Sequence, residues 1–188
     1  MQPTQFILYL TRDTAPTLDS FPAIVRHLER FRPILERRRE VQKNRIAWFH
    51  LHWPREEAIF TRPRIISVQM GRTPQFVFTE SPAFVGFSIN LILSPGNDVV
   101  RLQALTGILN SSLAGSWFAR HAKRRGINLE INAHVLRDFP VANLDSEAAQ
   151  LLADIVGKRH RAPPHLASNL ELEIESAVRA LYTGERPL

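Results

Sequence analysis

The sequence contains no cysteine, so disulfide bonds and metal sites built from thiolates are excluded. No apolar run approaches the roughly 20 residues that a membrane-spanning helix requires. The first residues, MQPTQFILYL, lack the basic stretch and small-residue cleavage site of a signal peptide. The eight glycines are scattered and form no glycine-rich cofactor loop. We therefore expect a cytoplasmic protein that is not associated with a membrane.

What is present is ordinary for a globular protein. The chain has 188 residues, of which 44% are hydrophobic and 22% are charged. This length suffices for one domain with a hydrophobic core, or for a domain with a helical appendage. We expect a single domain over residues 1–188, with a sheet-containing core to about residue 141 and a helical portion over about 142–188.

Basic residues are concentrated in the first and middle thirds of the chain. Between Arg26 and Arg72 there are 12 Lys and Arg against 5 Asp and Glu, and between Arg101 and Val141 there are 6 against 2. From Asn143 to Leu188 the balance reverses to 5 against 7. A polyanion-binding surface gives this pattern, and so does an arginine-rich soluble surface. The charge alone leaves both interpretations open.

Apolar residues at helical spacing predict a long helix near the N-terminus, after a short strand from Gln5 to Leu10. Asp19 or Ser20 would cap this helix, and Pro33 would kink or split it. Its apolar face would consist of Phe21, Ile24, Val25, Leu28, Phe31 and Leu35.

Three runs rich in β-branched and aromatic residues predict strands. They are Arg64 to Met70, Gln75 to Glu80 and Ala83 to Leu93, with turn residues between them. A helix over about 102–121 and two C-terminal helices follow, of which the first begins at Asp145 or Ser146 and the last stops at Gly184. The fold class is therefore α+β, with a small, twisted, mostly antiparallel sheet, a long N-terminal helix and a helical C-terminal portion.

Seven pieces of sequence occur in an order that is specific as a set. They are FPAIVRHLERFRPILERR, WFHLHWPRE, RPRIISVQMGRTPQFVFTE, SINLIL, LTGILNSSLAGSWF, RRGINLEINAHVLRDFPV and LEIESAVRALYTG. From about Phe6 to Tyr182 the chain resembles the TaqI-like C-terminal specificity domain of adenine-specific DNA methyltransferases and fused restriction–modification enzymes. It is more distantly similar to the recognition domains of type I specificity subunits.

The resemblance implies a target-recognition domain that positions double-stranded DNA for a methyltransferase catalytic domain or subunit. In that family the catalytic domain holds S-adenosylmethionine and flips the target adenine. The catalytic tetrapeptide of that domain, Asn/Asp/Ser-Pro-Pro-aromatic, is missing here. The one Pro-Pro pair, Pro163-Pro164, is preceded by Ala162 and followed by His165, which do not match the motif. We expect no catalysis and no cofactor in this chain, which is either an excised domain or a separate subunit.

One group of residues is a candidate for reading bases. Arg can bridge guanine O6 and N7 in the major groove, and Gln can pair with adenine N6 and N7. The residues that flank or occupy the first two predicted strands and their turn are Arg62, Arg64, Gln69, Arg72 and Gln75. A solvated hairpin with ordinary polar residues is the alternative.

A second group is a candidate for gripping phosphates. The densest basic cluster and its neighbour are Arg120, Lys123, Arg124, Arg125 and Asn128, with Gly126 allowing close backbone approach. Cations that stabilise a helix C-terminus would give the same pattern. Arg37, Arg38, Arg39, Lys43 and Arg45 either follow a DNA backbone or form a solvated helix face.

Two other functions stay open at this point. A metal-dependent nuclease or hydrolase would use His50 and His52, with His121 or His134, although a spaced third ligand is not evident and we expect no metal site. Glu171, Glu173 and Glu175 are expected to be solvated, because no nuclease spacing accompanies them. A basic subunit that docks on an acidic protein is the other alternative.

Overall fold

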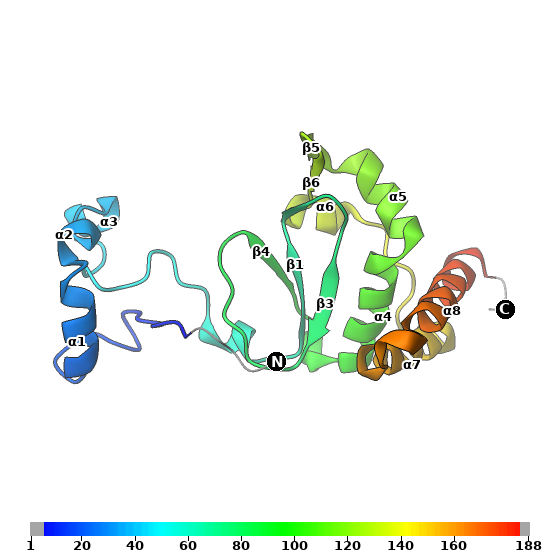
Figure 1. Ribbon diagram of the computed structural model, residues 1–188, viewed down its shortest axis with the longest axis horizontal. Helices are drawn as coiled ribbons and strands as arrows, with labels where there is room; N and C mark the ends of the chain where they lie inside the picture. Colours follow the sequence, from blue (N-terminus) through cyan, green and yellow to red (C-terminus); the bar gives the residue numbers. More distant parts are fainter. Residues whose placement is uncertain (1–5, 185–188) are drawn as a thin grey trace. The chain divides into compact units, whose positions relative to one another are not determined.

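The computed structural model describes residues 6–184, and the chain divides into two compact units, Met1–Glu56 and Glu57–Leu188. Figure 1 shows the first unit in blue and cyan and the second from cyan to red. The sequence-based boundary near residue 141 lies inside the second unit. Helices on the two sides of that boundary share one hydrophobic core, because α7 (Glu147–Arg161) packs on α4 (Val99–Asn110).

The first unit contains three short helices in place of the expected long one. They are α1 (Pro22–Glu29), α2 (Arg32–Leu35) and α3 (Arg39–Gln42). Pro33 lies in the first turn of α2, where a missing N–H is tolerated, so the helix is split before the proline. Phe21 is the N-cap residue of α1 and makes no side-chain capping bond, so the caps expected from Asp19 or Ser20 are not used.

The core of the first unit is small. Leu10, Ala15 and Leu18 are buried, and they pack against partly buried residues of α1 and of the aromatic segment after α3. The expected strand from Gln5 to Leu10 is not formed over residues 6–10, and Gln5 lies outside the described residues. Leu10 instead accepts one backbone hydrogen bond, from Leu51.

The second unit begins with the 3-10 helix η1 (Glu57–Phe60) and an antiparallel sheet of β1 (Arg64–Val68), β3 (Phe76–Thr79) and β4 (Ile89–Ile92). The strand order is β3-β1-β4. The predicted strand over 83–93 is shortened to β4, because the chain from Ala83 to Ser88 follows an irregular path that begins with a hydrogen bond from Ala83 to Phe60.

A second small antiparallel sheet joins segments that are far apart in the sequence. It consists of β2 (Met70–Gly71), β6 (Asn128–Glu130) and β5 (Lys123–Arg125), in that order. β2 lies in the segment that connects β1 to β3, but it pairs with β6. We call β5 and β6 (Lys123–Glu130) the basic hairpin. The sequence did not indicate this sheet, because two- and three-residue strands carry almost no periodicity.

Helices complete the second unit. After η2 (Pro95–Asn97) and α4 come α5 (Ser112–His121), α6 (Ala133–Asp138), α7 and α8 (Pro164–Thr183). Ser146 caps α7, and Gly184, in the left-handed conformation, ends α8, as the sequence predicted. The helix expected over 102–121 is broken at Ser111, whose hydroxyl accepts a hydrogen bond from Ala114 and so caps α5.

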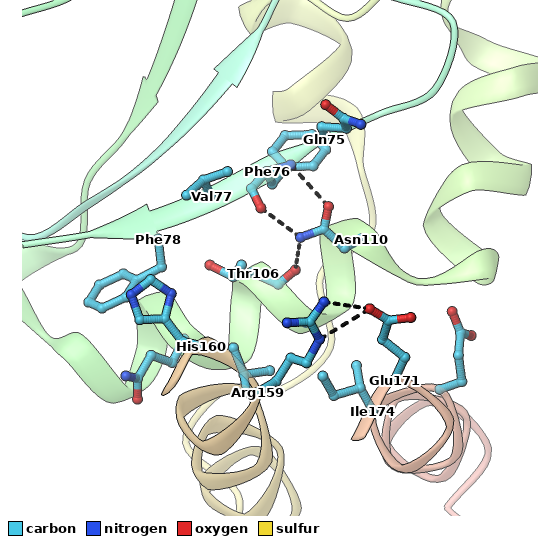
Figure 2. A pocket seen from close by; sticks show the side chains of 14 residues that line it. Gln75, Phe76, Val77, Phe78, Thr106, Asn110, Arg159, His160, Glu171 and Ile174 are labelled. Carbon is cyan, nitrogen blue, oxygen red and sulfur yellow. Dashed lines mark hydrogen bonds and ion pairs between the residues drawn. The ribbon is translucent and has the colours of Figure 1, made fainter. Parts of the chain in front are cut away.

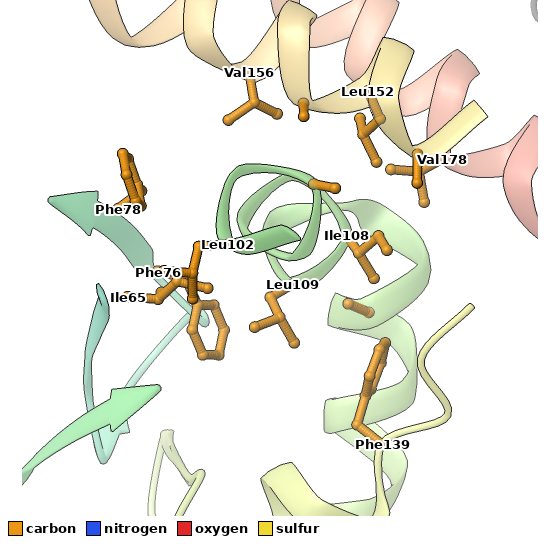
Figure 3. Packing of buried hydrophobic residues seen from close by; sticks show 14 of the residues in the cluster. Ile65, Phe76, Phe78, Leu102, Ile108, Leu109, Phe139, Leu152, Val156 and Val178 are labelled. Carbon is orange, nitrogen blue, oxygen red and sulfur yellow. The ribbon is translucent and has the colours of Figure 1, made fainter. Parts of the chain in front are cut away.

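The core lies on both sides of α4. Figure 3 shows Ile65, Phe76 and Phe78 of the first sheet on one side of α4, and Leu152, Val156 and Val178 of α7 and α8 on the other. The α+β class, the small antiparallel sheets and the helical C-terminal portion are confirmed. Over residues 6–184 no helix is long and apolar enough to cross a membrane.

Candidate nucleic-acid interface

The second sheet brings Gln69 and the turn at 71–74, from the first predicted group, beside the basic residues of the second group. Met70 and Gly71 of β2 pair with Glu130 and Leu129 of β6, and β6 pairs with β5. The backbone of Gln69 extends this pairing, because its carbonyl accepts a hydrogen bond from Ile131 at 2.7 Å. The turn at 71–74 and the basic hairpin, some 50 residues apart, are thus neighbours.

One face of this sheet carries most of its polar side chains. Cross-strand partners share a face, and Leu129 is buried, so Leu129 and Arg124 mark the inner face. The opposite face, here called the outer face, consists of Met70, Lys123, Arg125, Asn128 and Glu130. It offers two cations, an amide and one carboxylate.

The hairpin from β5 to β6 is closed by a two-residue turn. Arg125 pairs with Asn128, and Gly126 lies between them at φ +61°, a conformation that suits glycine at the first position of a tight hairpin turn. The next residue, Ile127, is 68% exposed at the tip. The turn therefore places an apolar side chain at the tip of a hairpin whose first strand carries three exposed cations.

An ion pair crosses the outer face. Arg125 Nε donates a hydrogen bond to Glu130 Oε2 at 2.8 Å. This hydrogen bond, together with the nearby charges of Arg125 and Lys123, lowers the pKa of Glu130 from its ordinary value. The pair links β5 to β6 through their side chains, and it offsets the charge of one cation on the outer face.

Three cations of the region remain available to a ligand. Arg72, Lys123 and Arg124 are exposed, and their side chains make no hydrogen bond or ion pair to any residue in 6–184. Gln75 is exposed as well. Arg120 is exposed, with its Nε donating to the Ser116 carbonyl of its own helix.

Gln69 and Asn128 are only partly exposed. The side-chain amide of Gln69 donates to the Phe87 carbonyl at 3.2 Å, which leaves the amide oxygen as its unused acceptor. Asn128 lies on the outer face beside Arg125.

Arg64 is placed in the interior, contrary to its predicted role in reading bases. It is fully buried, and its guanidinium donates to the carbonyls of Arg62, Ser81 and Ala83 at 2.6–3.4 Å. Burial lowers its pKa from the ordinary value. Its Nε has no partner among the described residues. Arg64 therefore fastens the loops that flank β1 and β3, and we remove it from the set of proposed DNA contacts.

Arg62 is also separated from the other candidates. Its guanidinium donates to Asn97 Oδ1 at 2.7 Å and to the Ser94 carbonyl, which ties it to η2. It precedes β1, whereas β2 follows that strand, and a five-residue strand spans roughly 16 Å. Strand pairing therefore brings Gln69, Lys123, Arg124, Arg125 and Asn128 together, with Arg72 directly after β2, and leaves Arg62 and Arg64 at the other end of β1.

Sequence reasoning missed the apolar part of this surface. Met70 is 50% exposed on the outer face, and Ile127 is 68% exposed at the tip of the hairpin. An apolar side chain next to cations can pack on sugars or on a thymine methyl group. The only signal in the sequence was an apolar residue directly after Gly126 in a polar turn.

The histidines considered for a metal site have other partners. The ring of His50 is buried, with Nδ1 accepting from the Ala47 N–H and Nε2 2.8 Å from the Ala15 carbonyl. His52 Nε2 lies 3.0 Å from Glu40 Oε2. In residues 6–184 no group of three or more His, Asp or Glu side chains is arranged to hold a metal ion. His50 therefore secures the fold of the first unit.

A cleft of about 580 Å³ lies between β3, α4, α7 and α8 (Figure 2). Asn110 at the end of α4 crosses to β3, where its amide accepts from the Phe76 N–H and donates to the Phe76 carbonyl. Arg159 of α7 is paired with Glu171 of α8 at 2.7 Å. Asn110, Arg159 and Glu171 in the cleft wall therefore have partners within the protein, and Gln75 lies at one end of the cleft.

Two of the three glutamates expected to be solvated have structural partners. Glu171 pairs with Arg159, and Glu175 accepts hydrogen bonds from the backbone N–H and the hydroxyl of Ser112 at 2.7 Å each. The carboxylate of Glu175 therefore caps the first turn of α5 from another helix, which is a favourable place for a negative charge.

Comparison with known proteins agrees with the resemblance seen in the sequence. The model of the TaqI-like C-terminal specificity domain matches residues 34–141, which is more than half of the chain and includes β1 to β6. A search of curated proteins finds no significant match. The matched length and the agreement of the fold class show that this chain belongs to the family of TaqI-like C-terminal specificity domains.

Proposed function

We propose that the chain recognises a DNA sequence through the outer face of the second sheet, the hairpin tip at Ile127 and the turn Gly71 to Pro74. The supporting observation is the pairing of β2 with β6, which puts side chains able to read bases next to side chains able to bind phosphate. Family membership supports duplex DNA as the ligand. In this proposal Arg72 and Gln75 read base edges, and Lys123 of the outer face binds a phosphate. Arg124, which is exposed on the opposite face of the edge strand β5, binds a phosphate beside that edge.

The chemistry belongs to a partner in this proposal. An adenine-specific methyltransferase domain or subunit holds S-adenosylmethionine and transfers the methyl group, while this chain holds the duplex in register. A rigid sheet suits that task because base contacts require fixed side-chain positions. The whole chain then acts as one target-recognition module.

Binding measurements on two variants test the proposal. Arg72→Ala should relax preference at one position of the recognition site, because a good bidentate base contact contributes about 1–3 kcal/mol of discrimination. Lys123→Ala should weaken binding to every duplex and reduce the slope of log K against log salt by about one. Arg179→Ala, which removes an exposed cation from α8, is the matched control and should change neither property.

Fluorescence anisotropy with a library-selected duplex and a scrambled duplex, each at two salt concentrations, separates these effects. Equal losses for both variants on both duplexes would contradict the division between base reading and phosphate binding. No salt-dependent affinity for either duplex would favour docking on an acidic protein over DNA recognition.

A further inference from the structure

Trp53, in the first unit, is held in an unusual and conspicuous position. Its side chain is 77% exposed, and its backbone lies in the left-handed region at φ +56°. The other non-glycine residues with positive φ in 6–184 are Asn44 and Asn97, and asparagine tolerates this conformation. A bulky aromatic residue in that region is a true outlier, and such outliers persist where surrounding contacts fix them.

The contacts that fix Trp53 lead back to a helix. The imidazole of His52 stacks on the indole, with ring centroids 4.2 Å apart and planes inclined by 26°. His52 Nε2 is held 3.0 Å from Glu40 Oε2, and Glu40 of α3 is buried, with only 7% of the residue exposed. A buried carboxylate thus orients the histidine, and the histidine supports one face of the tryptophan.

The other face of the indole is open to a planar ligand. Within residues 6–184, the ring of His52 is the one aromatic group that lies against Trp53. An exposed tryptophan with one face already supported loses little side-chain freedom when a second ring stacks on it. The arrangement is therefore suited to extend a stack by one ring.

The surroundings favour an anionic ligand. Residues 1–56 contain ten Lys and Arg against six Asp and Glu. Arg39, next to Glu40 in α3, has a side chain that is 72% exposed, and its Nε lies 3.8 Å from Glu40 Oε1. A cation and the stacked pair therefore share one carboxylate, that of Glu40.

We propose that Trp53 stacks on an unpaired nucleobase of a nucleic acid, with Arg39 interacting with the adjoining phosphate. A planar base matches the open indole face, and a phosphate matches the cation. The base must be unpaired because a base within a duplex is already stacked on both faces. This site is independent of the basic hairpin, so it stands whether or not the hairpin binds DNA.

Two duplexes of the same sequence provide the test, one fully paired and one with a single extra unpaired adenine. The full-length chain should bind the bulged duplex more tightly. Trp53→Ala should abolish this preference, which means a loss of roughly 5- to 150-fold in affinity for the bulged duplex, the amount expected for one stacked base. Its affinity for the paired duplex should stay unchanged. Trp53→Phe should retain part of the preference, since a smaller ring still stacks.

Matched variants keep the result interpretable. Ile34→Ala removes an exposed apolar side chain from the same unit and should leave the preference intact. Lys123→Ala, if the hairpin binds DNA, should weaken binding to both duplexes equally and leave their ratio unchanged. Circular dichroism of every variant verifies that the fold is retained.

Fluorescence gives a second readout that does not depend on affinity alone. In the variant Trp48→Phe/Trp117→Phe, Trp53 is the one tryptophan left, and the bulged duplex should quench its emission whereas the paired duplex should not. Equal affinity of the wild type for the two duplexes would overturn the proposal. An equal effect of Trp53→Ala on both duplexes would also overturn it and assign the indole to another apolar contact.

Discussion

Two arginines of similar sequence context have opposite environments. Arg64 and Arg72 both lie next to predicted strands, yet Arg64 is fully buried and Arg72 is exposed. The buried guanidinium donates to three backbone carbonyls, those of Arg62, Ser81 and Ala83, and so ties together the segments on either side of the sheet. Residue type alone cannot distinguish these roles, because the N–H donors of a guanidinium can bind either a guanine base or a set of backbone carbonyls.

Replacing Arg64 should therefore affect stability and not only DNA binding. Arg64→Met retains the aliphatic volume but leaves the carbonyls without donors, so we expect a loss of about 2 kcal/mol or more in the free energy of unfolding. Arg72→Met should change it by no more than about 0.5 kcal/mol. Urea denaturation measures both values, and a negligible effect at Arg64 would refute the structural role.

At the scale of elements, side chains outside the strands complete the sheets. Asn110 at the end of α4 bonds both backbone groups of Phe76 on the edge strand β3 and also donates to the Thr106 carbonyl. It therefore acts as a short substitute for a neighbouring strand and fixes the distance between α4 and the sheet (Figure 2). In the sequence it was an ordinary Leu-Asn-Ser within a helix.

Asn110→Leu should separate this role from mere packing. The apolar side chain leaves the Phe76 N–H and carbonyl without their partner, and we expect a loss of about 1–3 kcal/mol in the free energy of unfolding. Hydrogen exchange should identify the Phe76 amide as strongly deprotected in the variant. Unchanged protection of that amide would mean that β3 is held by other contacts.

Glu130 is expected to weaken DNA binding although it supports the hairpin. Glu130→Gln removes the negative charge from the outer face and releases Arg125, so affinity for duplex DNA should rise a few-fold and the salt slope should steepen. Anisotropy titrations at two salt concentrations measure both changes. A lower affinity would show that the ordering of the hairpin by the ion pair matters more than its charge.

The same ion pair gives a pH dependence with a definite sign. Because Arg125 lowers the pKa of Glu130 in the folded protein, the pair contributes fully above the ordinary pKa of glutamate. Its contribution is lost as the pH falls through the lowered folded value. Glu130→Gln should lack this acid transition in the exchange rates of the hairpin amides.

At the scale of the whole molecule, the two units have very different cores. The second unit contains one large cluster built from both sheets, α4, α5, α7 and α8. Among its described residues, the first unit buries only three apolar side chains, Leu10, Ala15 and Leu18, in a segment at the marginal end of the size range of small domains.

A fragment of residues 57–188 should therefore fold by itself, and a fragment of residues 1–56 should not. We expect a cooperative thermal transition by circular dichroism for the larger fragment and a broad, non-cooperative change for the smaller one. The larger fragment should also bind duplex DNA with the same effect of Lys123→Ala as the full chain. A cooperative transition in residues 1–56 would contradict the comparison of cores.

The sequence by itself determined the features that depend on local chemistry. The cap at Ser146, the stop at Gly184 and the split at Pro33 follow from backbone hydrogen bonding over a few residues. The strands around Ile65 and Phe78 follow from apolar residues with β propensity, and the ordered sequence pieces indicated the family.

Only the tertiary structure decided which residues form a surface. The pairing of β2 with β6 joins segments about 60 residues apart through two residue pairs, and no local pattern specifies so short a strand. The hydrogen bond of Arg64 to Ser81 and the ion pair of His52 with Glu40 likewise depend on how the chain folds back on itself. Local preference selects the elements, whereas long-range packing and hydrogen-bond satisfaction select the site.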